Sequence, residues 1–175
     1  MSQKPYNYFR PNAFRMAIQE LPEVSFTCQS VNLPWLSANN PTQATPFIDI
    51  PRLADKLTHD DLRVSFIVKE DLSNYIELYN WLVGITFPND YNEFGLFVDS
   101  RTSRLFTRDK EGVAYSDITV SLYDSDNINT YDLIYKGCIP KFLQPTPLDI
   151  KSQGVEYVTC DASFDYSMFS IKQIS

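Results

Sequence analysis

Alternation of apolar and polar side chains runs through much of this chain and predicts a mainly β protein. The clearest example is residues 62–68, where every second side chain is apolar, as in a strand with one buried face. A similar alternation over 24–31 predicts another strand. Residues 12–18 are its expected hairpin partner, with a turn near Leu21 and Pro22.

The C-terminal third predicts three further strands, at 114–123, 130–142 and 155–171. A polar turn at 124–127 separates the first two of these strands. The order of strand, short turn and strand is typical of hairpins, so the strands are expected to be antiparallel.

One segment has the period of a helix. The spacing i, i+3, i+4 and i+7 defines a single stripe of large side chains, formed by Tyr75, Leu78, Tyr79 and Leu82. Asp71 or Ser73 can cap its N-terminus and Gly84 can end it. About six strands with one helix predict a single domain over 1–175, an antiparallel β-sandwich or partly closed barrel with one flanking α-helix.

Two segments fit neither pattern. Residues 36–51 mix turn-forming residues with a brief apolar run, which predicts an extended arm that contacts another molecule. Residues 86–112 predict a loop excursion that carries a basic cluster, formed by Arg101, Arg104, Arg108 and Lys110.

Composition limits the class of protein. Of 175 residues, 43% are hydrophobic and 21% are charged, which supports a folded core and gives no membrane-spanning segment. The net charge of −7 disfavours tight nucleic-acid binding, because that affinity needs a surplus of Lys and Arg. No secretory signal is expected, because residues 1–12 are polar and aromatic, and the three scattered cysteines are expected to be core residues in a reducing compartment.

Few residues suggest catalysis or cofactor binding. The single histidine, His59, is more typical of a loop than of a catalytic base, since no nucleophile motif accompanies it. The segment 124–135 resembles a calcium loop only faintly, because Asn129 stands where Gly is needed and Tyr135 where Glu is needed. The five glycines form no phosphate-binding motif. We therefore expect no enzyme, no cofactor and no metal.

Charge is unevenly distributed instead. Segment 115–135 contains four aspartates and no Lys or Arg, whereas 101–110 carries four cations. Oppositely charged regions, open strand edges and an extended arm together favour self-assembly.

The order of several short motifs resembles the tail tube proteins of T4-like contractile-tailed bacteriophages. The resemblance covers about residues 7–168 and rests on RPNAF (10–14), FTCQSVNLP (26–34), the strand 61–68 with its helix ending in NWL (80–82), and KGCIP (136–140). The same order of motifs is similar to that of baseplate proteins that initiate the tube, although we expect this chain to lack their usual extra domains. Residues 86–112 are longer than a minimal tube subunit requires.

The resemblance implies a homo-oligomer in which hexameric rings stack into a tube. This tube would lie inside a contractile sheath in the virion tail and be assembled in the host cytoplasm. The implied partners are the tail sheath, baseplate and tail terminator proteins, with DNA passing through the bore without specific binding. It also implies relatedness to the tube of type VI secretion systems.

Two sets of residues are expected to matter in such a tube. An acidic lumen would let DNA slide, and the candidate lumen-facing residues are Asp60, Asp61, Asp117, Asp124, Asp126 and Asp132. The candidate inter-subunit arm residues are Asn39, Asn40, Gln43 and Phe47. The alternative is a monomeric β-sandwich binding module in which Trp35 and Tyr91 form a platform.

Overall fold

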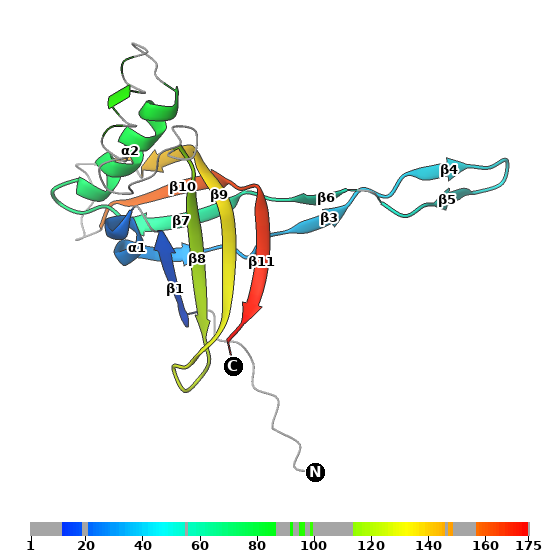
Figure 1. The fold of residues 1–175 in the computed structure, drawn as a ribbon, viewed down its shortest axis with the longest axis horizontal. Helices are drawn as coiled ribbons and strands as arrows, with labels where there is room; N and C mark the ends of the chain where they lie inside the picture. Colours follow the sequence, from blue (N-terminus) through cyan, green and yellow to red (C-terminus); the bar gives the residue numbers. More distant parts are fainter. Residues whose placement is uncertain are drawn as a thin grey trace.

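Two antiparallel sheets joined by one long strand form the body of the protein (Figure 1). This computed structural model describes residues 12–18, 21–54, 56–86, 92, 95, 96, 99, 114–145, 147–148 and 157–174. The first sheet contains, in order, β1 (Phe14–Ile18), β8 (Ser116–Tyr123), the N-terminal part of β9 (Asn129–Pro145) and β11 (Met168–Gln173). The second sheet contains β2 (Cys28–Val31), β7 (Leu62–Ile67), β10 (Thr159–Asp165) and the C-terminal part of β9.

The chain passes from one sheet to the other at two neighbouring points. Gly137 in β9 has a φ of 63°, and its N–H donates to Asp117 Oδ1 at 3.0 Å. The corner between β10 and β11 lies beside it, where the Ser167 N–H donates to the Lys136 carbonyl at 3.0 Å. The two crossings bring the sheets face to face over a shared core.

Alternate residues of the strands fill that core, as the sequence predicts. In β7, Leu62, Val64 and Phe66 are buried, whereas Arg63 is exposed. The corresponding positions of β8 and β10 also point inward. The barrel is not closed, because β1 and β2 end the strand order β1-β8-β9-β10-β7-β2. The predicted class, mainly β with antiparallel sheets, is confirmed.

Helix α2 (Ser73–Thr86) covers one opening of the sandwich. Trp81 packs near Phe164, with ring centroids 5.9 Å apart, and its Nε1–H donates to the Ala114 carbonyl. The predicted stripe is only partly correct, because Leu78 is buried but Tyr79 is half exposed. Gly84 does not end the helix; it is a buried position within the last turn.

The predicted strand at 24–31 is wrong in its first half, which forms helix α1 (Pro22–Thr27). Pro22 favours a first helical turn because its φ is fixed and it has no N–H to leave unpaired. The Ser25 hydroxyl donates to the Leu21 carbonyl and accepts the Ile18 N–H. The predicted hairpin with 12–18 is also wrong, since β1 pairs with β8.

The run at 155–171 likewise divides into β10 and β11 at the Tyr166–Ser167 corner. Most of the predicted excursion at 86–112, including its basic cluster, lies outside the described residues.

Candidate assembly interface

A two-stranded arm leaves the body between β2 and β7 (Figure 1). Its inner part pairs β3 (Leu36–Ala38) with β6 (Leu57–His59), and its outer part pairs β4 (Thr42–Ala44) with β5 (Asp49–Pro51). The arm is therefore a paired ribbon and extends beyond the 36–51 expected from turn-forming residues. Gln43 Oε1 accepts a hydrogen bond from Arg52 Nε across the outer part at 2.9 Å.

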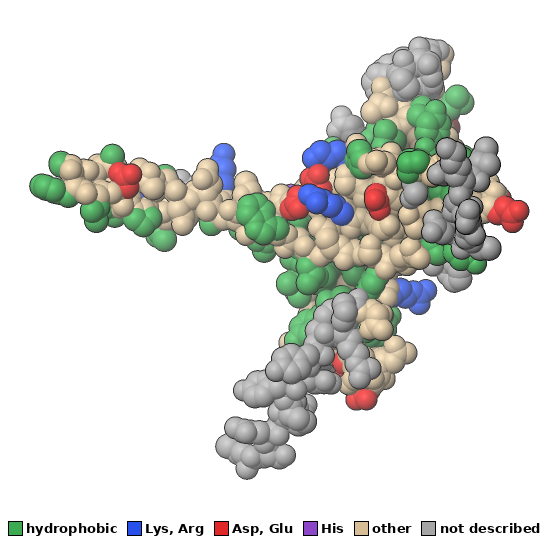
Figure 2. Space-filling view, turned by 180° about the vertical axis from the view of Figure 1, so that it is seen from behind, with side chains coloured by type: hydrophobic (Ala, Val, Ile, Leu, Met, Phe, Trp, Pro, Cys, Tyr) green, Lys and Arg blue, Asp and Glu red, His purple; other side chains and the backbone are tan. Residues whose placement is uncertain are grey.

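Apolar side chains on the arm face solvent (Figure 2). Phe47 is 94% exposed at the tip and Leu53 is 92% exposed between β5 and β6. The other large apolar side chains exposed here are Trp35, Leu36, Ile48, Ile50 and Leu57. A ribbon of two strands is marginal by itself, and apolar patches of this kind mark interaction surfaces.

All four predicted arm residues lie on this ribbon and are exposed. They are Asn39, Asn40, Gln43 and Phe47. Sequence reasoning missed Leu53 and Leu57, since they follow Pro51, where the predicted arm ends. The pairing of β3 with β6, from Ala38–Leu57 to Leu36–His59, is the feature that extends the ribbon to the body.

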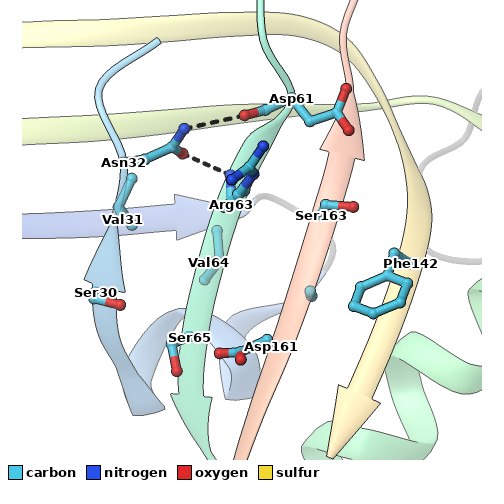
Figure 3. Close-up of a pocket in the computed structure, with 11 residues that line it drawn as sticks. Ser30, Val31, Asn32, Asp61, Arg63, Val64, Ser65, Phe142, Asp161 and Ser163 are labelled. Atoms are coloured by element: carbon cyan, nitrogen blue, oxygen red, sulfur yellow. Dashed lines mark hydrogen bonds between the residues drawn. The ribbon is translucent and has the colours of Figure 1, made fainter. Parts of the chain in front are cut away.

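A shallow hollow of about 580 Å³ lies on the face of the second sheet that points away from the core (Figure 3). Small polar side chains from three strands form much of its floor, namely Ser30, Ser65 and Ser163. Phe142, Arg63, Asp61 and Asp161 lie around them. One sequence pattern indicates this surface: the alternation at 62–68 places Ser65 on the outer face.

The six predicted acidic residues fall in separate places. Asp60 and Asp61 lie at the arm root, where Asp60 pairs with Arg63 at 3.1 Å. Asp124 and Asp126 lie in the β8–β9 turn, where Asp124 Oδ1 accepts the Asp126 N–H.

The remaining two belong to the first sheet. Asp117 accepts the Gly137 N–H, and Asp132 accepts hydrogen bonds from the Ser121 hydroxyl and the Asn129 amide. Of the six, only Asp61 borders the hollow. The six carboxylates therefore do not form one surface of the subunit.

Lys141 links two carboxylates beside the arm root. Its Nζ lies 3.0 Å from Asp61 Oδ2 and 3.2 Å from Asp165 Oδ1. Burial raises the pKa of Asp61, but the Lys141 hydrogen bond and charge, together with the Asp165 hydrogen bond and the Arg63 charge, hold that pKa below its usual value.

The cysteines are not poised for chemistry. Cys138 and Cys160 are buried and Cys28 is half-buried, and all three are free thiols. Burial raises their pKa values to about 12 for Cys138 and about 11 for Cys28 and Cys160. Reactivity requires the thiolate, so these side chains are structural.

Within the described ranges, His, Cys, Asp and Glu side chains form no group of three or more that could hold a metal ion. None of the helices in that part of the chain has the length and apolarity needed to cross a membrane.

No protein-family model matches the sequence, and no curated protein matches it. Solved structures do match across nearly the whole chain. A chain of the anti-feeding prophage cap, the tube terminating cap, aligns with a TM-score of 0.65 and 11% identity over 99% of this chain and 97% of its own. A chain of the anti-feeding prophage baseplate aligns with a TM-score of 0.60 and 10% identity over 98% and 97%.

A third match is a chain of the sheath-tube complex of an extracellular contractile injection system. Its TM-score is 0.55 and its identity 10%, over 95% of this chain and 93% of that one. At such identities the likeness concerns the fold alone. This fold agrees with the one that the order of motifs in the sequence suggests. This chain has the tail-tube fold found in components of contractile injection systems.

Proposed function

We propose that this chain is a structural subunit of a contractile tail, in which six copies form a ring and the rings stack into the inner tube. The observation that carries the proposal is the arm, a ribbon whose exposed apolar side chains have no use in a lone subunit. The fold shared with chains of tube, baseplate and cap assemblies supports it.

The strand order of the second sheet is suited to ring closure. Its four strands alternate in direction, so β2 at one edge runs opposite to β9 at the other. Copies related by rotation would therefore bring β2 of one beside β9 of the next as an antiparallel pair. A closed ring of such sheets would leave no exposed edge.

The hollow face of the second sheet is the surface we assign to the passage. A sheet closed into a tube has its concave side inward, and here that side carries the small hydroxyls of Ser30, Ser65 and Ser163. Arg63 is held by Asp60, so its charge is partly offset. Counted together with their ion-pair partners, the charged side chains at the hollow are still acidic in sum, because four carboxylates face two cations; this would let DNA pass without binding tightly. They are Asp60, Asp61, Asp161 and Asp165 against Arg63 and Lys141.

In this arrangement Asp60 and Asp61 remain lumen candidates. Asp117 and Asp132 lie on the first sheet, and Asp124 and Asp126 lie in its β8–β9 turn. All four would therefore lie away from the bore. The arm would reach the next ring, and the outer surface of the tube would meet the sheath. The baseplate and tail terminator proteins would bind the two ends of the tube in the virion tail.

Labelling two central strands with a cysteine reagent tests this proposal. Ser65→Cys places a thiol on the hollow face and Thr119→Cys a comparable half-buried thiol on the outer face of the first sheet. Native thiols contribute little background at neutral pH, because their pKa values are near 11 or above. The probe is a maleimide carrying a polymer too bulky to enter the tube.

Both variants should react as free subunits, whereas in assembled tubes only Thr119→Cys should react. Tubes in which Ser65→Cys reacts would overturn the assignment of the passage. Featureless monomers in electron micrographs at high concentration would overturn the tube proposal itself and favour a monomeric binding module.

A second candidate is a component that starts or ends the tube, because two of the matched chains come from a baseplate and a terminating cap. Copy number per particle separates the two roles. A tube subunit occurs in many rings, whereas an initiator or terminator occurs in one or a few.

A further inference from the structure

The arm is fixed to the body by an aromatic stack at its root. The imidazole of His59, the last residue of β6, lies over the ring of Tyr166 with centroids 4.1 Å apart and planes inclined by 16°. Tyr166 forms the corner between β10 and β11 and is only 5% exposed. The stack therefore joins the exposed arm to a residue of the core.

Further aromatic contacts connect Tyr166 to the core. The ring of Tyr166 meets Tyr135 edge-on at 5.0 Å, and Tyr135 in turn lies 5.1 Å from Phe169. Tyr135 is fully buried on β9. Since close-packed aromatic rings have fixed orientations, Tyr166 presents a rigid surface to His59.

A salt bridge holds the chain two residues after His59, between β6 and β7. Asp61 is bound by Lys141, which also binds Asp165, the residue before Tyr166. Lys141 is the extra residue of a bulge in β9, between the pairs Ser163–Phe142 and Phe164–Pro140. A bulge redirects a side chain, and here the redirected side chain reaches the arm root.

The outgoing strand is fixed at the same level by Asn32. Its Oδ1 accepts the Arg63 N–H at 2.6 Å and its Nδ2 donates to the Asp61 carbonyl at 3.1 Å (Figure 3). The side chain thus continues the pairing of the two strands where they leave the body. Beyond this point the strands pair with each other, and their side chains are mostly exposed.

The length of the arm makes its root angle important. A strand rises about 3.3 Å per residue, so Phe47 lies roughly 40 Å from His59 along the ribbon. A swing of about 10° at the root would therefore move the tip by roughly 7 Å, about the width of one side chain. Docking such a tip on another subunit depends on how well the root defines its direction.

We propose that the His59–Tyr166 stack is a latch that sets the direction of the arm in the single subunit, before assembly. His59 is a positioning residue in this role. Presetting the arm reduces the ordering entropy that docking on a second copy would otherwise cost. The inference goes beyond the tube function, because the latch operates within one chain.

Spin labels on the arm and the body of the monomeric full-length chain test the latch. Ala44→Cys on β4 and Ser170→Cys on β11 provide two exposed labelling sites. With His59 present, the distance distribution between the labels should be narrow. His59→Ala should widen it by about twofold or more, because a two-stranded ribbon has little support of its own.

Two variants control the chemistry of the contact. His59→Phe keeps a planar ring and should keep the narrow distribution. Tyr166→Phe removes only a buried hydroxyl that has no hydrogen-bond partner among the described residues, and should keep it too.

Two results would overturn the proposal. One is a distance distribution in His59→Ala as narrow as that of the parent protein. The other is a distance distribution in His59→Phe as broad as that in His59→Ala. The measurement uses single subunits, so it tests the latch even if the proposed tube function is wrong.

Discussion

Gly137 is the residue on which the two-sheet architecture most directly depends. Its φ of 63° is a left-handed conformation, and a Cβ at this position would lie 2.6 Å from Ser167 Oγ. That hydroxyl is itself hydrogen-bonded to the Lys136 carbonyl. The chain thus has space only for glycine where β9 turns from one sheet into the other.

Gly137→Ala should therefore lower the free energy of unfolding by about 2 kcal/mol, from left-handed strain and displacement of Ser167. Urea unfolding followed by tryptophan fluorescence measures the change. Gly95→Ala is the control, because its Cβ would meet nothing within 4 Å. Equal stability of both variants and the parent protein would show that the crossing tolerates a side chain.

The Asp61–Lys141 bridge should make stability depend on pH in the acid range. The pKa of Asp61 is lower when folded than when unfolded. Its contribution is therefore complete above the unfolded pKa and is lost as the pH falls through the folded one. Asp61→Asn should lower the urea midpoint at neutral pH, and the gap to the parent protein should close on acidification.

Asp126→Asn, an exposed change in the β8–β9 turn, controls for the loss of one negative charge. A gap between Asp61→Asn and the parent protein that is constant from neutral to strongly acidic pH would contradict this role of the bridge.

At the level of elements, the sequence predicts a strand or a helix correctly where the apolar residues fit only one of the two periods. Strand β7 alternates without interruption, and helix α2 has a clear helical spacing. The run 21–28 fits two periods, because Leu21, Val24 and Cys28 have the spacing of a helix while Val24, Phe26 and Cys28 have the alternation of a strand. Only packing against the body decides between such alternatives.

The candidate surfaces were predictable to different degrees. Turn-forming residues indicated an arm, since they are local signals. The hollow was not predictable, because Ser30, Ser65 and Ser163 come from three strands whose pairing depends on long-range contacts. Nearness in sequence suggests a common surface for Asp117 and Asp126, but Asp117 lies at the start of β8 and Asp126 in the turn beyond its far end, so the length of the strand separates them.

Because its apolar side chains are exposed, the arm should be needed for assembly but not for folding of the subunit. Replacing Phe47 and Leu53 by Ser should change the free energy of unfolding of the subunit by less than about 0.5 kcal/mol, since both are almost fully exposed. The same change should sharply reduce the fraction of protein that sediments as tubes.

Ile128→Ser, an exposed apolar residue in the β8–β9 turn, is the matched control and should leave assembly unchanged. Unimpaired tubes from the Phe47 and Leu53 variant would contradict a role for the arm in subunit contacts.

At the scale of the whole molecule, two driving forces for assembly make opposite predictions about salt. Copies that each carry a net charge of −7 repel one another. If apolar arm contacts and strand pairing hold the tube together, salt should screen this repulsion and lower the concentration needed for assembly. If attraction between acidic and basic regions dominates, salt should raise that concentration. We expect the first result, because exposed apolar side chains line the arm, and Arg63 and Lys141 beside its root are already paired within the chain. Sedimentation across a sodium chloride series measures the protein concentration needed for assembly. Tubes that dissolve as salt increases would show instead that pairing between acidic and basic regions is the main driving force.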